Sequence, residues 1–193
     1  MIGIIGSRTT IAREFMRLTD EPICRARLED MPHDLDQYLI AMGFLLGEAI
    51  ADQSPEEQDR AWRVNFAQIA VFCDTVFAAN DHARICIIGS ASGMRPCYDM
   101  AYAGAKAAIH HYINTKRLSA PGQQIVGIAP DVIGDSGMTD RRTDYADCMA
   151  RGAASRRGTH LTPVDVARLA HFLLCVDDGA ICNVVIRMDG GLK

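Results

Sequence analysis

The alternation of short apolar runs with amphipathic runs limits the fold of this chain more than any other feature. Strands that alternate with helices imply right-handed βαβ units, a parallel sheet and helices on both faces of the sheet. The sequence therefore predicts a doubly wound α/β sheet in one domain spanning residues 1–193. The predicted strands are 2–6, 23–28, 36–43, 84–90, 124–130 and 182–191, and the predicted helices are 11–18, 54–80, 98–118 and 162–176.

The long helix at 54–80 has a well-marked start. Ser54 is a typical N-cap residue, Pro55 suits the first helical position, and Glu57 completes a capping box. Within the helix, Asn65 lies among apolar residues. Asparagine is a poor residue there unless its side chain, or a disturbed helical turn, makes use of it. A hydrogen-bonded structural asparagine is the default interpretation, and a site residue is the alternative.

Charge and composition argue against several classes of protein. The net charge of −4 is not gathered in blocks, whereas nucleic-acid binding needs clustered Lys and Arg. The apolar runs are shorter than a membrane span, and the first residues do not resemble a signal peptide. Seven cysteines without CxxC or zinc-site spacing indicate buried thiols. We therefore expect a cytoplasmic protein with no metal and with neither nucleic acid nor membrane as a partner.

The first strand is followed by a segment that could bind phosphate. "GSRTTIA" leads directly into a helix N-terminus, which is where a pyrophosphate binds in sheets of this kind. Gly6 supplies a tight turn there, but Thr10 and Ala12 occupy positions where glycines usually allow a close approach to the backbone. Taken alone, the segment fits a phosphate loop and an ordinary turn equally well.

Two further segments carry residues suited to acid–base chemistry. "GSASG" places Ser90 just beyond a strand, which in isolation would indicate only a polar turn. "DMAYAGAKAA", residues 99–108, predicts a helix with a thin flank, on which Tyr102 and Lys106 lie one turn apart on the same face. A free tyrosine has a pKa of about 10, and a neighbouring ammonium lowers that pKa by favouring the phenolate. Alone, each of the two would most often be a surface residue.

Together these residues form a recognisable set. Asn65, Ser90, Tyr102 and Lys106 occur in this order, each on an element that would bring it to one edge of the sheet. With the terminal "DGG", the set resembles the short-chain dehydrogenase/reductase family over nearly the whole chain. The segments similar to the family's motifs are "IGIIGSRTTIA", "LIAMG", "WRVNF", "IIGSASG", "YAGAK" and "IAPDVIGDSGMT".

The resemblance implies a Rossmann-like fold and a site for hydride transfer between a nicotinamide cofactor and a small carbonyl or alcohol substrate. Tyr102 would be the general acid or base, assisted by Lys106, and Ser90 would hydrogen-bond the substrate oxygen. Asn65 would hold a water that relays protons to Lys106. The cofactor carries the hydride, and the protein supplies position and electrostatics. The cofactor-binding residues would be Gly6, Ser7, Arg8, Thr10, Ile11, Arg27, Ala41, Met42, Gly43, Tyr102, Lys106, Pro130 and Ile133.

The chain also departs from the family's pattern. It resembles a shortened member, because a helix and a strand normally found between Leu28 and Asp36 are missing. Met42 replaces a small residue near the adenosine ribose, and Asp131 replaces the glycine after Pro130, close to the nicotinamide. An alternative is therefore a non-catalytic relative, a dinucleotide-sensing or scaffold protein that kept the fold. A lyase or epimerase on the same scaffold is a third interpretation.

Two expectations concern the cofactor and the assembly. An acidic residue at the end of the second strand binds the ribose of NAD, whereas arginine accommodates the 2′-phosphate of NADP. Arg25 or Arg27 could end this strand, with Glu29 close behind, and Arg8 adds a second cation. We favour NADP over NAD on this basis. Family members pair through the helices that correspond to 55–80 and 98–118, which implies a homodimer or homotetramer here.

Overall fold

The six strands form one parallel sheet, as the alternation predicts. The computed structural model describes residues 1–134, 137, 139 and 144–191. The strand order is β2-β1-β3-β4-β5-β6, and every neighbouring pair is parallel. The order reverses between β1 and β3, which creates a crevice at their carboxyl ends. The strands are β1 (Ile2–Ile5), β2 (Ile23–Ala26), β3 (Gln37–Ile40), β4 (Arg84–Ile88), β5 (Gln124–Pro130) and β6 (Val184–Met188).

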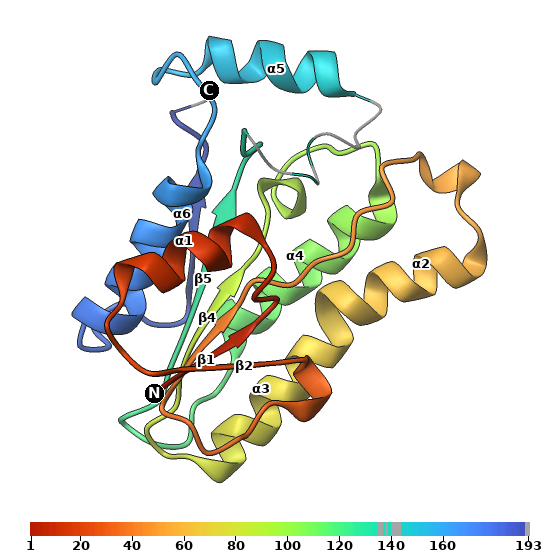
Figure 1. The fold of residues 1–193 in the computed structure, drawn as a ribbon. Coiled ribbons are helices and arrows are strands. Elements are labelled where there is room, and N and C mark those ends of the chain that lie inside the picture. Colours follow the sequence, from red (N-terminus) through yellow and green to blue (C-terminus); the bar gives the residue numbers. More distant parts are fainter. Residues whose placement is uncertain (135–136, 138, 140–143, 192–193) are drawn as a thin grey trace.

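Helices cover both faces of the sheet (Figure 1). Helices α1 and α6 lie on one face, and α3 and α4 on the other, while α5 lies beyond the carboxyl ends of the strands. This arrangement confirms the doubly wound, Rossmann-like prediction. The helices are α1 (Thr10–Leu18), α2 (Pro55–Trp62), α3 (Gln68–Ala79), α4 (Met100–Thr115), α5 (Tyr145–Ala154) and α6 (Pro163–His171).

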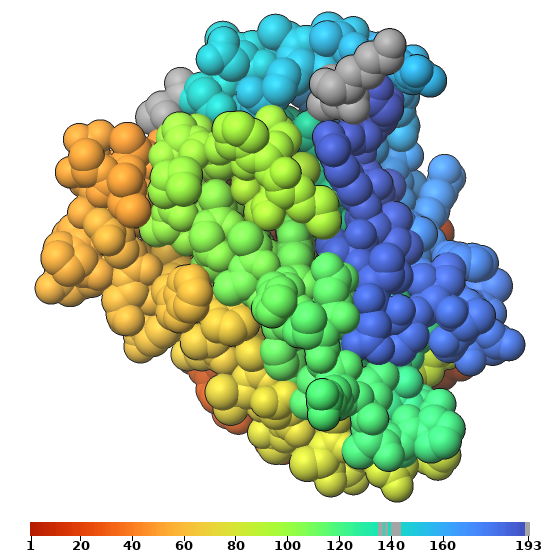
Figure 2. Space-filling view, turned by 180° about the vertical axis from the view of Figure 1, so that it is seen from behind, coloured from red at the N-terminus to blue at the C-terminus, as the bar shows by residue number. Residues whose placement is uncertain are grey.

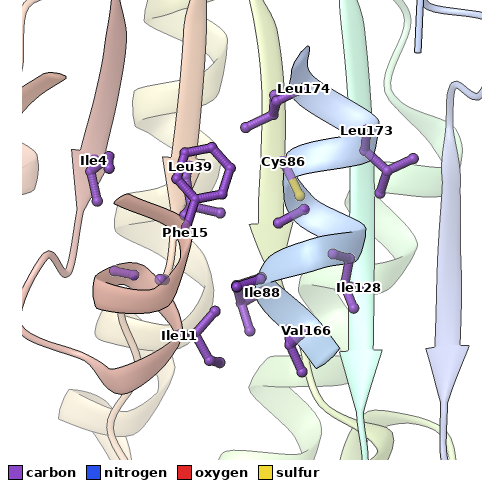
Figure 3. Close-up of a cluster of buried hydrophobic side chains, with 14 of the residues drawn as sticks. Ile4, Ile11, Phe15, Leu39, Cys86, Ile88, Ile128, Val166, Leu173 and Leu174 are labelled. Carbon is purple, nitrogen blue, oxygen red and sulfur yellow. The ribbon is translucent and has the colours of Figure 1, made fainter. Parts of the chain in front are cut away.

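Apolar side chains from the strands, α1 and α6 form one buried cluster on this face of the sheet. Ile4 and Leu39 from the sheet and Phe15 from α1 are fully buried. Figure 3 shows these side chains pointing from the strands and helices into one cluster. Strands covered on both faces need apolar residues on both sides, so they lose the alternation of a half-exposed strand.

Local signals placed the starts of α2 and α6 correctly, but both predicted helices contain a π-helical turn. Ser54 and Thr162 both form capping boxes, with Glu57 and Asp165 respectively. The predicted helix at 54–80 is not regular, because a π-helical turn at Arg63–Ala67 separates α2 from α3. The helix predicted at 162–176 likewise ends in a π-helical turn, over residues 172–176.

Two other segments differ in how well the sequence predicted them. Between β2 and β3 the chain forms only a short 3₁₀ turn, Leu28–Asp30, which agrees with the predicted shortening. Helix α5 was not predicted, because the sequence indicated a loop over 134–160. The described part of α5 buries only Cys148 and Gly152, so it has no apolar stripe to detect.

The described residues form no helix that is long and apolar enough to cross a membrane. All seven cysteines are free thiols. Cys73, Cys86 and Cys148 are buried, as predicted, and the other four are partly exposed.

Two glycines near α4 have opposite surroundings. Gly93 ends a short 3₁₀ turn after β4, and a Cβ there would lie 2.7 Å from the backbone of Lys106 and Ala107. Gly104 lies within α4, and no described atom outside its own helix backbone would lie within 4 Å of its Cβ. Close packing therefore requires glycine at 93 but not at 104 within this chain.

We expect alanine to have opposite effects at these two positions. Gly93→Ala should lower the free energy of unfolding by about 1–3 kcal/mol, because it forces the turn away from α4. Gly104→Ala should raise it by about 0.5–1 kcal/mol, because alanine is the better helix former. Urea denaturation of both variants tests this, and equal stability of Gly93→Ala and wild type would contradict the packing argument.

Candidate active site

A cavity of about 420 Å³ opens at the carboxyl ends of the strands. Its walls come from the segments that follow β1, β3, β4 and β5, and from the first turns of α4. Most residues predicted to bind a cofactor line it, but Gly6, Ser7 and Arg27 do not. The predicted residues in the lining are Arg8, Thr10, Ile11, Ala41, Met42, Gly43, Ser90, Tyr102, Lys106, Pro130 and Ile133.

The turn after β1 depends on Gly6. This residue has φ +81°, and a Cβ there would lie 2.8 Å from the backbone of Ala41 and Met42. Thr9, which sequence reasoning missed, caps α1: its hydroxyl donates to the Gly6 carbonyl at 2.9 Å and accepts from the Ala12 N–H at 3.3 Å. Threonine just before a helix is itself an N-cap signal. The turn thus brings the helix N-terminus to the end of β3.

The arginines considered for cofactor choice lie in different settings. Arg8 is exposed and lines the cavity. Strand β2 ends at Ala26, so Arg27 follows it directly and Glu29 comes two residues later. The Arg27 side chain is 82% exposed, and its Nη1 lies 3.9 Å from Oε1 of Glu29. Arg27 is therefore free to meet a group outside the cavity.

Asn65 is fully buried in the π-helical turn and outside the cavity lining. Its Nδ2 donates to the carbonyls of Phe44 at 2.7 Å and Ala61 at 2.9 Å, and its Oδ1 accepts from the Phe44 N–H at 3.0 Å. Both amide hydrogens are used in these bonds. Asn65 thus holds the loop after β3, and Phe44 of that loop lines the cavity.

A buried aspartate, absent from the sequence prediction, ties the same loop to α4. Asp99 is fully buried and caps α4 by accepting from the Tyr102 N–H at 3.0 Å. It also accepts from Nε2 of Gln53 at 3.0 Å and from the Gly47 N–H at 3.3 Å. Its position three residues before Tyr102 is an N-cap signal that could have revealed it. Asp99 therefore fixes both the loop and the helix that carries Tyr102.

Tyr102, Lys106 and Ser90 all line the cavity. Tyr102 and Lys106 are 5% and 2% exposed. The Lys106 ammonium donates to the Ile88 carbonyl at 3.1 Å and lies 5.7 Å from the centroid of the Tyr102 ring. Ser90 Oγ accepts from the Ser92 N–H at 3.2 Å. The structure thus places three of the four predicted catalytic residues in one cavity.

His110 lies one helical turn beyond Lys106 and supports Ser90 through a hydrogen bond to its backbone. Its Nε2 accepts from the Ser90 N–H at 3.3 Å, and a Cβ on Gly89 would lie only 2.3 Å from that nitrogen. Burial, and then the charge of Lys106, lower the pKa of His110 to about 4, so the imidazole is neutral at pH 7. Sequence reasoning missed this residue, although its four-residue spacing from Lys106 repeats that from Tyr102.

An ion pair between Arg95 and Asp131 completes the described wall of the cavity. Asp131 was singled out from the sequence as a departure from the family, whereas Arg95 was not. The segment 128–139, which resembles the nicotinamide-binding motif, is described except for 135, 136 and 138. Within it, Thr139 Oγ1 donates to the Ile133 carbonyl at 2.8 Å and lines the cavity.

Burial lowers the pKa of Lys106 from 10.5 to about 8. Between these values the unfolded chain binds more protons than the folded one, so Lys106 makes stability rise with pH. We expect the stability advantage of Lys106→Met over wild type to be greatest below pH 8. It should shrink by about 3 kcal/mol as pH rises to 10.5. Chemical denaturation at a series of pH values measures this, and a constant difference would contradict the burial effect.

Comparisons with known proteins identify structural but not sequence relatives. No family model and no curated protein matches the chain. Three solved structures with TM-scores of 0.80 to 0.83 cover nearly all of it. A short-chain dehydrogenase family protein from Francisella tularensis has a TM-score of 0.81 and 14% identity, over 98% of this chain and 96% of that one.

The other two structures agree with the first. The ligand-free aldohexose dehydrogenase of Thermoplasma acidophilum has a TM-score of 0.83 and 15% identity, over 99% of this chain and 93% of that one. ElxO with NADP bound has a TM-score of 0.80 and 16% identity, over 98% of this chain and 96% of that one. The chain described here therefore has the fold of the short-chain dehydrogenases and reductases.

Proposed function

We propose that this chain is a short-chain dehydrogenase/reductase that interconverts a carbonyl and an alcohol with NAD(P). The observation that carries the proposal is the presence of Ser90, Tyr102 and Lys106 in one cavity, beside the helix N-terminus that follows β1. The fold shared with solved dehydrogenases supports it.

The residues around the β1–α1 turn fit a dinucleotide. The approach of Gly6 to Ala41 and Met42 leaves no room for a Cβ, and Arg8 supplies a positive charge at the cavity. A helix N-terminus attracts phosphate through its free N–H groups. Arg8, Thr10 and Ile11 would hold the pyrophosphate side, and Tyr102 and Lys106 the ribose nearest the reaction. The bound cofactor supplies or accepts the hydride.

Tyr102 exchanges the proton that accompanies hydride transfer. The phenol gives its proton to the substrate oxygen during reduction and takes it back during oxidation. Lys106 favours the phenolate because its ammonium lies close to the ring and is itself shielded from water. Ser90 orients the substrate oxygen, supported by His110 through the backbone. Asn65 holds the loop at Phe44, and its side chain has no amide hydrogen left for the proton-relay water that the family resemblance implies.

One observation favours the non-catalytic alternative. The Thr9 hydroxyl already accepts from the Ala12 N–H, so one donor of the α1 N-terminus is used within the chain. If the loss of this N–H donor outweighs the remaining contacts, the chain binds a dinucleotide only weakly. Titration with NADPH and NADH, followed by fluorescence, tests this: no binding of either would support the scaffold interpretation, because both an oxidoreductase and a dinucleotide sensor must bind the cofactor.

We propose NADP rather than NAD as the cofactor, since the exposed Arg27 directly follows β2 and Arg8 adds a second cation at the cavity. The ratio of the dissociation constants for NADPH and NADH should favour NADPH in wild type. Arg27→Ala should reduce this preference by about tenfold, the effect of losing one charge-assisted hydrogen bond. Fluorescence titration of wild type, Arg8→Ala and Arg27→Ala measures the ratio. Tighter NADH binding that neither substitution changes would make Glu29 or Asp30 the ribose partner instead.

The role of Tyr102 can be tested directly. Tyr102→Phe should fold normally, bind the cofactor and lose at least about 100-fold in kcat, because it lacks the hydroxyl that exchanges the proton. Steady-state oxidation of NADPH with a panel of small aldehydes and ketones measures the loss. Circular dichroism checks the fold, and Tyr145→Phe, which changes an exposed tyrosine, is the matched control. Substantial turnover by Tyr102→Phe would exclude this phenol as the acid.

We also propose a homodimer or homotetramer that pairs through α2, α3 and α4. Ile69, Phe72 and Val76 are buried in the chain's own core, so they do not form the contact. Trp62 and Val71 are 45% and 66% exposed on the same helices and are better candidates. Figure 2 shows α3 and α4 side by side on one outer face of the molecule.

Light scattering of the purified protein measures this assembly. We expect a mass two or four times the 21.1 kDa of one chain at micromolar concentration. Val71→Asp should lower the mass by placing a charge in the apolar contact. Val176→Asp, which puts the same charge at an exposed apolar residue beside α6 on the other face of the sheet, is the control. A monomeric wild type would contradict the proposal.

A further inference from the structure

A charged pair lines the candidate active-site cavity, and the proposed reaction does not use it. Arg95 belongs to the segment after β4, and Asp131 directly follows β5. Nη2 of Arg95 donates to Oδ1 of Asp131. Both residues line the same cavity as Ser90 and Tyr102. A substrate held by Ser90 and Tyr102 therefore meets this pair in the same cavity.

The carboxylate of the pair is fixed to the sheet. The Asp131 side chain is 7% exposed, and its Oδ1 also accepts from the Val132 N–H at 2.8 Å. The Asp131 N–H donates to the carbonyl of Met188 in β6 at 2.7 Å. The Arg95 side chain is more open, at 24% exposed. Asp131 is thus an anchor that holds the guanidinium of Arg95 at the cavity.

The guanidinium has more donors than the described residues use. Arginine carries five N–H donors in a rigid fork. Among the described residues Arg95 makes one hydrogen bond, to Asp131, and its buried Nε has no partner there. A carboxylate can accept two parallel N–H bonds from such a fork, which a neutral oxygen cannot match. The unused donors of Arg95 therefore suit a second carboxylate.

The charge around the cavity favours the same kind of ligand. The described lining carries three basic side chains, Arg8, Arg95 and Lys106, against a single acidic one, Asp131. Arg8 lies on the β1–α1 turn, where the dinucleotide phosphates are proposed to bind. Arg95 and Lys106 lie on the segments that follow β4, near Ser90. The part of the cavity that would receive the substrate thus has an excess of positive charge, which attracts an anion.

We propose that Arg95 selects substrates that carry a carboxylate in addition to the reacting carbonyl or alcohol, and that Asp131 is its positioning residue. This inference rests on the proposed function and deepens it. The substrate carboxylate accepts from the free donors of Arg95 while the carbonyl oxygen faces Tyr102 and Ser90. In reduction, the oxo-acid gains a hydride from the reduced cofactor and a proton from Tyr102. The products are a hydroxy acid and the oxidised cofactor.

Kinetics with matched substrates provide the first test. The probes are ω-oxo-carboxylates of four to eight carbons, each compared with the alkanal of the same length, with NADPH as reductant. In wild type, at least one oxo-acid should exceed its alkanal about 10- to 100-fold in kcat/KM, which corresponds to a charge-assisted hydrogen bond. Arg95→Met should remove this advantage, so that kcat/KM for the oxo-acid falls to the value for the matched alkanal. Arg63→Met, which removes a surface arginine paired with Asp59 at 3.0 Å, should keep it.

Binding provides a second test that does not depend on turnover. Calorimetry compares ω-hydroxy-carboxylates with the matched alkanols, in the presence and absence of NADP⁺. Wild type should bind the hydroxy acid about tenfold more tightly, Arg95→Met should lose the difference, and Arg95→Lys should keep only part of it because lysine lacks the fork. The lysine variant and the wild-type comparison carry the test if Arg95→Met fails to fold.

The outcomes separate the two proposals. Alkanals reduced as readily as the oxo-acids, together with equal binding of hydroxy acids and alkanols, would overturn the role of Arg95 and leave the oxidoreductase proposal standing. A binding preference for the hydroxy acids that Arg95→Met removes, without turnover of any carbonyl, would support Arg95 and overturn the proposed function.

Discussion

The close approach of helix α4 to the end of strand β4 is the constraint on which the candidate site depends. Glycine at 89 and 93 lets the chain after β4 come within contact of the α4 backbone and of His110. The same approach allows Lys106 to donate to the Ile88 carbonyl at 3.1 Å from a buried position. Ser90 and Tyr102 then line one cavity although they belong to different elements. A bulkier residue at either glycine would separate the groups that the proposed reaction needs together.

The loop after β3 is held by side chains from two helices rather than by its own sequence. Asn65 binds both backbone groups of Phe44, and Asp99 accepts from Gln53 and Gly47. These two buried polar side chains satisfy backbone groups that would otherwise be left unpaired. Asn65 also accounts for the π-helical turn in which it lies, because its Nδ2 bonds the Ala61 carbonyl four residues earlier. Phe44 is thereby held in the wall of the cavity.

Features set by neighbouring residues could be predicted from the sequence. The capping boxes at Ser54 and Thr162 and the helix that carries Tyr102 and Lys106 depend on residues three or four positions apart. The buried strands could be recognised because both of their sides are apolar. Helix α5 could not, since its described residues bury few side chains and give no apolar period. The bonds from Asn65 to Phe44 could not be predicted either, because Phe44 lies 21 residues earlier and no local pattern reveals so distant a partner.

The sequence alone was enough to predict the six strands in their order, the doubly wound sheet and the pairing of Tyr102 with Lys106 on one helix face. These features follow from apolar periodicity and short-range spacing, which can be recognised within a short stretch of the sequence. The three-dimensional packing was needed to show that His110 supports Ser90, that Arg27 lies outside the cavity lining, and that Arg95 meets Asp131. Each of these contacts joins segments that are brought together by the packing of the sheet. The residues that make these contacts become neighbours only when the chain folds, so no short stretch of the sequence reveals them.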